Sequence, residues 1–438
     1  MSDGKYQEGT GADMFKQHNI ITAVELGTSK VSILIGEYSG EDGLQVIGKG
    51  ESASGGAVVK GEIDSMDLMI EKVIDAMDQA DLQSGRELNN SAMFAVSVTG
   101  CDMDSLLGEG TAFIQNEDHR ITEEDICEAI SNSRVQPLDV TRRLINSFDA
   151  YFMIDGMRRF AQPLNQRAST LKAFSHIIHG NSNRLENFSA ILLDAGLDCE
   201  PEMIFAPIAD MFGVLSDDEV EGGALLIDFG AGVTEYAVVC NSGILSSGVL
   251  GIGFEHVAND LAVGLNLPIN YCRKLLEDGT LQQLNFENIP LVECRTNSGS
   301  HRRIPLESFN KIVDVRIREI FELIRIRLGK QSFWNNLAAG CVLTGGGAEF
   351  FRTRDIFHQV CDLPSRIGKP FNVKGIADEI DSARYSTVYG TLRYAYQLCL
   401  QHESRRRGSF GSGLRAKISD LGDGVARMFK SLRNNMSI

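Results

Sequence analysis

The sequence has no run of about 18 uninterrupted apolar residues, the length that a membrane-spanning helix needs. Residues 1–18 are polar and Gly-rich and lack the apolar core of a signal peptide, so we expect a disordered leader there. The nine cysteines include no C-x-x-C pair, and each lies at least 20 residues from the next. This spacing excludes a disulfide framework and a zinc knuckle, and it favours a protein of the reducing cytoplasm.

Basic residues are scarce as well: 42 Lys and Arg stand against 59 Asp and Glu, a net charge of −17. We therefore expect no nucleic-acid partner, because phosphate binding needs a basic surface. The charge is uneven, since residues 402–438 hold eight Lys and Arg against three acidic residues, a local balance of +5 that leaves −22 for residues 1–401. An acidic body with a basic tail suggests two separate functions.

Two common nucleotide signatures are also missing. There is no G-x-x-x-x-G-K-[ST], and Gly251-Ile-Gly253 continues as Phe-Glu-His, which excludes a P-loop and a Rossmann fingerprint. The pair His176-Ile-Ile-His179 is expected to be a strand feature rather than a metal site, because side chains at i and i+3 of a strand point to opposite faces.

What the chain does contain is a repeated unit, within a length of 438 residues that suits two to four domains. Strand-like runs 20–24 and 31–35 enclose the turn Glu25-Leu-Gly-Thr-Ser-Lys30, and strand 44–47 and a helix capped by Ser65 follow. The same order recurs as strands and a helix at 224–228, 234–239, 244–250 and from about 254. We therefore predict two similar α/β domains that face each other.

Both copies end the first strand with a carboxylate and place a glycine two residues later, in Glu25-Leu-Gly27 and Asp228-Phe-Gly230. Two such turns facing each other could clamp phosphate oxygens with backbone N–H groups, while the carboxylates hold the hydration shell of a Mg²⁺. A third glycine turn, after strand 341–344, could line an adenosine. We predict ATP with Mg²⁺, held by Glu25 and Asp228 through water, with nucleotide-binding residues Gly27, Thr28, Ser29, Lys30, Gly230, Ala231, Gly232, Thr234, Gly345, Gly346 and Gly347.

The segment between the two copies and the C-terminal tail have their own patterns. Strand 92–98, a helix from Thr122 to about Ser133 and strand-like residues 143–169 predict an inserted α+β subdomain. After a Gly/Ser/Arg linker, one helical face with basic flanks is formed by Leu414, Ile418, Leu421, Val425, Met428, Phe429 and Leu432. We expect this segment to bind anionic lipid as a helix that forms on contact; the alternative is a helix packed on the body or on a partner.

Taken together, these motifs resemble the actin and heat-shock chaperone ATPase superfamily and, within it, the FtsA family of bacterial cell-division proteins. The resemblance covers about residues 21–400 and rests on the segments Val24-Glu-Leu-Gly-Thr-Ser-Lys30, Glu202-Met-Ile-Phe-Ala-Pro207, Ile227-Asp-Phe-Gly-Ala-Gly232, Asn259-Asp-Leu-Ala262, Val342-Leu-Thr-Gly-Gly-Gly347 and Arg366-Ile-Gly368. It implies an actin-like, two-lobed α/β ATPase fold with an inserted α+β (SHS2-type) subdomain.

The resemblance also implies a subdomain division and a function. The division is: leader 1–18; lobe 1 (1A) 19–88, 170–200 and 380–400; inserted subdomain (1C) 89–169; lobe 2 (2A) 201–258 and 307–379; subdomain 2B 259–306; linker 401–413; amphipathic membrane helix 414–438. The implied function is an ATP-binding protein on the cytoplasmic side of the membrane at the division site, which polymerises, tethers FtsZ filaments and recruits later division proteins through the inserted subdomain. Arg302, Arg303 and Arg316 resemble residues near the surface for the FtsZ tail.

The motifs depart from the family pattern at named positions. Ala231, Val233 and Glu235 stand where a Gly, a Thr and an Asp are usual, and about Cys272 and Leu275 replace the usual ribose-binding Glu and Lys. No catalytic base can be assigned, so we expect at most a slow ATPase. Three alternatives stay open: a small-molecule kinase of the same superfamily, a pilus-assembly ATPase-like scaffold, and a scaffold that no longer binds ATP.

Overall fold

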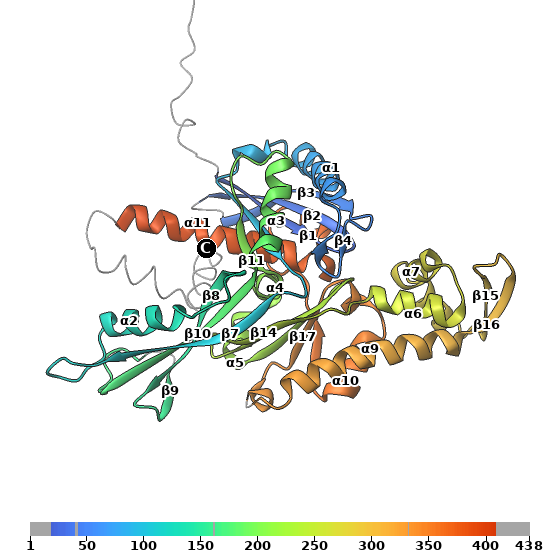
Figure 1. The fold of residues 1–438 in the computed structure, drawn as a ribbon. Coiled ribbons are helices and arrows are strands. Elements are labelled where there is room, and N and C mark those ends of the chain that lie inside the picture. Colours follow the sequence, from blue (N-terminus) through green and yellow to red (C-terminus); the bar gives the residue numbers. More distant parts are fainter. Residues whose placement is uncertain (1–18, 40–42, 161–162, 332, 409–438) are drawn as a thin grey trace, which may run out of the picture.

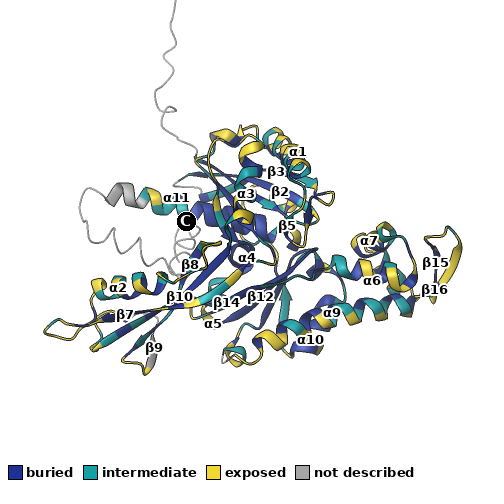
Figure 2. Ribbon diagram, viewed as in Figure 1, coloured by how far each residue is buried: buried dark blue, intermediate teal, exposed yellow. Residues whose placement is uncertain are grey.

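The computed structural model describes residues 19–39, 43–160, 163–331 and 333–408. Two α/β lobes occupy its centre, an antiparallel sheet with one helix extends from one end, and a group of short helices with a hairpin forms the other end (Figure 1). Strands in the centres of the sheets are buried, and exposed residues lie on the outer helices and at the two ends (Figure 2). Within the described residues, no helix has the length and hydropathy of a membrane-spanning segment.

Lobe 1 is a five-stranded sheet in the order β11-β6-β1-β2-β3. The β1–β2 hairpin is antiparallel, whereas β6 lies parallel between β1 and β11. α11 covers one face of this sheet and α1 the other (Figure 1). Its elements are β1 (Asn19–Leu26), β2 (Lys30–Ser39), β3 (Gly43–Ala53), β4 (Val58–Val59), β5 (Glu62–Ile63), α1 (Met66–Ser84), η1 (Leu88–Asn90), β6 (Met93–Val98), α3 (Ser182–Asp194), β11 (Glu202–Phe205), η4 (Ala377–Glu379), η5 (Ala383–Tyr385) and α11 (Ser386–Gly408).

Lobe 2 repeats this plan in the order β14-β13-β12-β17-β18, so the predicted repeat is confirmed. Along β12, Leu225, Ile227 and Phe229 pack with α9, whereas Leu226 belongs to the core on the opposite face, next to α4. This alternation is the period of a strand that is buried on both faces. Its elements are α4 (Ala206–Val214), α5 (Asp217–Gly222), β12 (Ala224–Phe229), β13 (Thr234–Cys240), β14 (Gly243–Leu250), α6 (Glu255–Leu265), α9 (Leu306–Leu328), η2 (Trp334–Asn336), β17 (Cys341–Thr344), η3 (Gly346–Glu349), α10 (Thr353–Cys361) and β18 (Ser365–Ile367).

The two lobes are joined where α4 crosses α11, and the two backbones touch there. A Cβ added to Gly390 of α11 would lie 1.8 Å from the carbonyl oxygen of Ala209, and one added to Gly213 of α4 would lie 2.6 Å from that of Ser386. Only glycine fits at such a distance, because real Cβ contacts do not come below about 3 Å. The crossing therefore holds the two lobes together at one place.

The inserted subdomain is an antiparallel sheet in the order β7-β10-β8-β9 with α2 on one face. The Thr122–Asp125 capping box begins α2, as the sequence predicts. Against lobe 2, the Ser105 hydroxyl donates to the carbonyl of Ser247, and the buried His176 Nε2 lies 2.8 Å from the Ser247 hydroxyl. Its elements are β7 (Asp104–Phe113), α2 (Glu123–Arg134), β8 (Arg142–Ile154), β9 (Arg158–Phe160) and β10 (Thr170–Asn181).

Several boundaries differ from the sequence-based expectation, and one of them is that of lobe 1, because β11, expected in lobe 2, pairs with β6 in the sheet of lobe 1. The sheet of the inserted subdomain spans residues 104–181 rather than 89–169, because β6 pairs with β1 in lobe 1 and β10 is an inner strand of the inserted sheet. The expected linker begins too early, since α11 continues through residues 401–408. Glu403 on that extension accepts hydrogen bonds from Tyr38 Oη and Asn19 Nδ2, at 3.3 and 3.4 Å.

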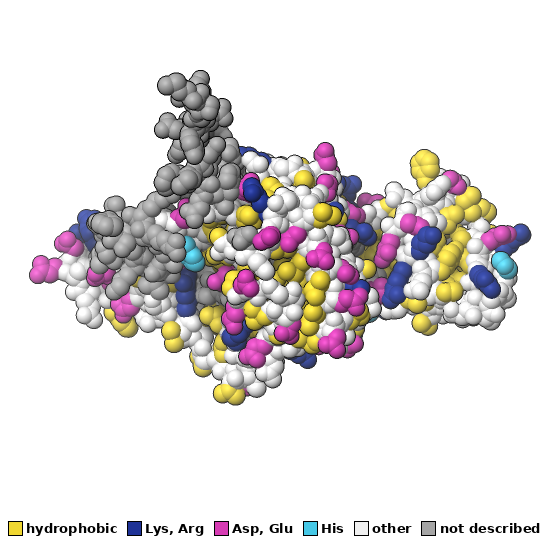
Figure 3. Space-filling view, turned by 90° about the horizontal axis from the view of Figure 1, so that it is seen from above, with side chains coloured by type: hydrophobic (Ala, Val, Ile, Leu, Met, Phe, Trp, Pro, Cys, Tyr) yellow, Lys and Arg dark blue, Asp and Glu magenta, His cyan; other side chains and the backbone are white. Residues whose placement is uncertain are grey.

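The far end of lobe 2 carries α7 (Ile269–Glu277), α8 (Thr280–Phe286) and the isolated hairpin of β15 (Leu291–Arg295) and β16 (His301–Pro305). α7 packs against both α6 and α8. In the view of Figure 3, acidic side chains are scattered over the central body, while basic and hydrophobic side chains lie close together at the end with α7, α8 and the hairpin.

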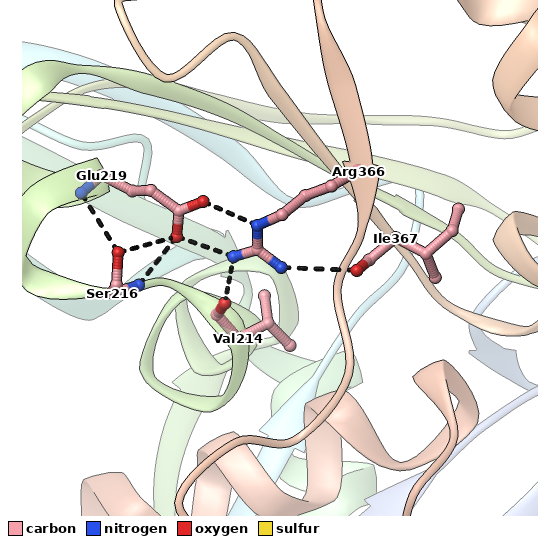
Figure 4. A network of polar contacts seen from close by, with 5 residues as sticks. All are labelled: Val214, Ser216, Glu219, Arg366 and Ile367. Atoms are coloured by element: carbon pink, nitrogen blue, oxygen red, sulfur yellow. Dashed lines mark hydrogen bonds and ion pairs between the residues drawn. The ribbon is translucent and has the colours of Figure 1, made fainter.

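An arginine network ties the turn after α4 to β18 (Figure 4). Arg366 donates two hydrogen bonds of 2.7 Å to the carboxylate of Glu219 and one of 2.7 Å to the carbonyl of Val214. The same carboxylate accepts from the backbone N–H and hydroxyl of Ser216 in the capping box of α5. Although partial burial raises the pKa of Glu219, the Arg366 and Ser216 donors hold it below its usual value.

Replacing Arg366 by Met should lower the free energy of unfolding by about 1 to 2 kcal/mol at pH 7, because the half-buried Glu219 loses its bidentate partner. A carboxyl whose pKa is depressed in the folded state stabilises above its unfolded pKa and loses that contribution on acidification. The difference between wild type and Arg366→Met, measured by urea denaturation, should therefore shrink below about pH 4. Equal stabilities at pH 7 would contradict this role, and Arg366→Lys should lie between the two.

Candidate functional site

A cavity of about 740 Å³ lies between the two lobes. The turns β1–β2, β12–β13 and β17–η3 all contribute to its wall, so glycine segments from three distant parts of the chain meet there. Of the residues predicted to bind nucleotide or Mg²⁺, those that line the cavity are Glu25, Gly27, Thr28, Ser29, Lys30, Asp228, Gly230, Ala231, Gly232, Gly345, Gly346 and Gly347.

The tips of the first two turns meet at one end of this cavity. A Cβ added to Gly232 would lie 2.3 Å from the Thr28 hydroxyl, so the tips are in contact and a larger residue at 232 would displace the Thr28 side chain. The first turn is closed by a hydrogen bond of 2.9 Å from the Gly27 N–H to the Lys30 carbonyl. Two backbone turns thus converge on the same end of the cavity, as the sequence predicts for a phosphate clamp.

Thr234 is the one predicted nucleotide residue that the structure places elsewhere. It does not line the cavity, is fully buried, and donates its hydroxyl to the carbonyl of Ile252 at 2.7 Å. Thr234 lies on β13, and its hydroxyl pairs with a backbone carbonyl of the segment that leads into α6. The sequence position next to the turn suggested a phosphate donor, but the direction of the side chain depends on the pairing of β13.

The two predicted metal carboxylates have unpaired oxygens. Glu25 Oε2 and Asp228 Oδ1 are buried and have no hydrogen-bond partner among the described residues. Burial raises the pKa of Glu25 to about 7, against the opposing charge of Lys30, and burial raises the pKa of Asp228 to about 6. Buried carboxylate oxygens without a donor are suited to a hydrated divalent cation, and the described residues contain no cluster of three or more ligands that would replace its water shell.

Two further buried acids line or back this site, and sequence reasoning missed both roles. Glu235 of lobe 2 accepts a hydrogen bond of 2.8 Å from the Thr99 hydroxyl of lobe 1, which connects the lobes across the cavity. Asp210 on α4 accepts from the Thr387 hydroxyl of α11 at 2.9 Å, and burial raises its pKa well above the usual value. An acidic residue in the otherwise apolar segment of α4 was the available signal for Asp210.

The third turn forms the wall of the cavity next to Asp228. Gly345 has a φ of +81°, and a Cβ added there would lie 2.0 Å from Asp228 Oδ1. Beyond it, the wall is completed by Glu277, Gln282, Phe350, Phe351 and Arg384. Cys272 and Leu275 are buried in the core of lobe 2 and are not part of the wall, so at this place α7 presents Leu276 and Glu277 instead.

The three arginines expected near a partner surface do not form one cluster. Arg302 and Arg303 lie on β16, where Arg303 pairs with Glu293 and is largely exposed. Arg316 lies on α9, about 15 Å along the helix axis from the first residue, Leu306. Its side chain is paired with Asp260 and Glu319. The membrane residues Leu414, Ile418, Leu421, Val425, Met428, Phe429 and Leu432, like the leader 1–18, lie outside the described residues.

The pKa of Glu25 predicts a pH dependence for the ligand-free protein. A carboxyl whose folded pKa is raised stabilises fully below its unfolded pKa of about 4.5 and loses that contribution as the pH rises through about 7. Glu25→Gln should therefore stabilise the protein by about 2 kcal/mol at pH 8 and flatten the decline in melting temperature between about pH 4.5 and 7. Glu71→Gln, which removes an exposed carboxylate on α1, is the control. If the melting temperature of Glu25→Gln fell with rising pH as steeply as that of wild type, the raised pKa of a buried Glu25 would be contradicted.

Comparison with solved structures supports the fold. The chain matches a PilM–PilN type IV pilus biogenesis complex with a TM-score of 0.57 at 12% identity, over 86% of this chain and 98% of that one. It matches MreB 5 of Spiroplasma citri bound to AMPPNP with a TM-score of 0.52 at 12% identity, over 88% and 98%. The predicted actin-like fold with an inserted subdomain is thereby confirmed.

Comparison with family models and curated proteins identifies the family. The model "Cell division protein FtsA" matches residues 225–390, and the model "SHS2 domain inserted in FTSA" matches residues 100–179. The FtsA proteins of Borreliella burgdorferi and Pseudomonas aeruginosa are 27% and 26% identical, over 86% of this chain and 91% and 89% of theirs. The matches favour cell division over the kinase and pilus alternatives. The chain belongs to the FtsA family of actin-like cell-division proteins.

Proposed function

We propose that this protein binds Mg·ATP between its lobes, polymerises on the cytoplasmic face of the membrane at the division septum, tethers FtsZ filaments there and recruits later division proteins. One observation supports the binding of nucleotide most directly. The two glycine turns, one from each repeat, meet at one end of a cavity whose wall contains carboxylate oxygens without a hydrogen-bond partner among the described residues. The likeness in fold to an MreB solved with AMPPNP supports a nucleotide as the ligand.

In this proposal the residues of the cavity have separate tasks. The backbone of Gly27–Lys30 and Gly230–Gly232 holds the β- and γ-phosphates, and Gly345–Gly347 lies along the adenosine. Glu25 and Asp228 hold water molecules of Mg²⁺, which neutralises phosphate charge. No residue is assigned as a catalytic base. ATP therefore acts as a ligand that favours the closed arrangement of the lobes, and any hydrolysis is slow.

Within the division into subdomains 1A, 1C, 2A and 2B, different partners are assigned to different surfaces. Beside the paired Arg316 of α9, the neighbouring Val315 is 60% exposed, and Val263 is 85% exposed one turn after Asp260 on α6. This combination of a cation and exposed apolar side chains suits the FtsZ tail, with Arg302 and Arg303 as a second basic contact on β16. Later division proteins are assigned to the inserted subdomain.

Residues 414–438 are assigned to the membrane. The segment joins α11 within a few residues of Gly408, so a lipid-bound segment would hold the body close to the membrane surface. Its apolar positions are spaced as one helical face, and Lys and Arg flank that face. Binding should therefore depend on anionic lipid and weaken with salt.

Co-sedimentation with liposomes tests the anchor and its link to nucleotide. The full chain is compared with a chain ending at Gly408, which keeps the whole of α11, on vesicles of 30% anionic lipid and on neutral vesicles. We expect only the full chain to sediment, only with anionic vesicles, and more completely with Mg·ATP because filaments bind through many tails at once.

The matched control exchanges Leu421 and Phe429 for Glu, which keeps the tail's length but interrupts the apolar face. It should behave as the truncated chain does. Sedimentation of the truncated chain with anionic vesicles would contradict the assignment of the tail. A full chain that sediments equally with and without Mg·ATP would contradict the link between nucleotide and assembly.

A further inference from the structure

Lys30 is a cation in the wall of the cavity, on the first glycine turn, and it is already paired. Its Nζ lies 2.8 Å from Glu51 Oε2, and the Lys30 side chain is only 14% exposed. The same Nζ lies 3.7 Å from the centre of the Tyr385 ring, within the range of a cation–π contact. Three elements, β2, β3 and η5, therefore fix one ammonium group in the wall of the cavity.

Glu51 is fixed as firmly as Lys30. Its Oε2 also accepts a hydrogen bond of 2.8 Å from Tyr385 Oη, so one carboxylate oxygen holds both the ammonium and the phenol. Burial by itself raises the pKa of Glu51, but the hydrogen bond from Lys30 and further contacts together lower the pKa below its usual value. The carboxylate therefore stays ionised at neutral pH. Lys30 and Glu51 thus form an ion pair without net charge.

This pairing matters for an anionic ligand. Glu25, Glu51 and Asp228 all line the same cavity, and Lys30 is the cation on the β1–β2 turn that could offset a phosphate. As long as Lys30 is held by Glu51, the turn offers a triphosphate only backbone donors and hydroxyls. A phosphate oxygen near the turn can gain the ammonium only by taking the place of the Glu51 carboxylate.

We propose, on the basis of the proposed nucleotide site, that Glu51 is a specificity-determining residue that competes with the β- and γ-phosphates for Lys30. The competition lowers the affinity for every ligand that needs the ammonium and does not affect a ligand without those phosphates. Tyr385 is a positioning residue in this exchange, because its hydroxyl retains Glu51 when Lys30 leaves. Glu51 thereby keeps nucleotide binding reversible in a cavity that otherwise closes around the phosphates.

Isothermal titration of the full chain with Mg·ATP and, separately, with AMP tests this competition. Glu51→Gln keeps an acceptor for Lys30 and Tyr385 but removes the charge. We expect it to bind ATP about tenfold more tightly than wild type, with AMP affinity within about twofold. Lys30→Met should weaken ATP binding and leave AMP binding unchanged. A purely structural role of Glu51 would change the two affinities together.

The matched control is Glu37→Gln, which removes a carboxylate from the same strand as Lys30, where it pairs with Arg86 outside the cavity. It should bind both nucleotides as wild type does. If wild type binds ATP and Glu51→Gln binds it equally or less tightly, the competition is refuted while the nucleotide site stands. If neither wild type nor Glu51→Gln binds ATP or AMP, the nucleotide site is refuted and the competition with it.

Discussion

The structure depends on the crossing of α4 and α11, where two glycines allow the backbones to touch. α4 packs on the sheet of lobe 2 and α11 on the sheet of lobe 1, so the crossing is the floor between the lobes, and one hydrophobic core runs through it. Contact this close leaves little room for the lobes to slide, and it favours rotation about the crossing. The cavity above it is therefore the place where a small ligand can change the arrangement of the whole molecule.

The chemistry of that cavity is dominated by buried acid. Glu25, Asp210, Asp228 and Glu235 lie around one end, and burial raises the pKa of each. Their mutual repulsion and unpaired oxygens are costly to bury, and a cation would relieve both. The Glu235–Thr99 hydrogen bond meanwhile spans the lobes. Ligand charge and lobe closure are thus connected through the same few side chains.

Features that depend on residues close together in the sequence could be predicted from local patterns. The carboxylate-x-Gly turns, the capping box at Thr122 and the repeated strand order all follow from residues within a few positions of one another. The place of Thr234 beside a motif predicts a phosphate donor, but its hydroxyl pairs with Ile252 of a separate segment, and the pairing of Arg316 with Asp260 likewise joins separate segments. The role of Asp210 and the extent of the inserted sheet also depend on which strands and helices meet in three dimensions, and a short window of sequence does not contain that information.

The most direct test of the account is the structure of the full chain with Mg²⁺ and a non-hydrolysable ATP analogue. The account predicts the β- and γ-phosphates between the turns at Gly27–Lys30 and Gly230–Gly232, with the cation's water molecules on Glu25 and Asp228. It also predicts that α4 and α11 keep their glycine contact. A nucleotide bound outside this cavity, or a cavity that stays empty at saturating analogue, would contradict it.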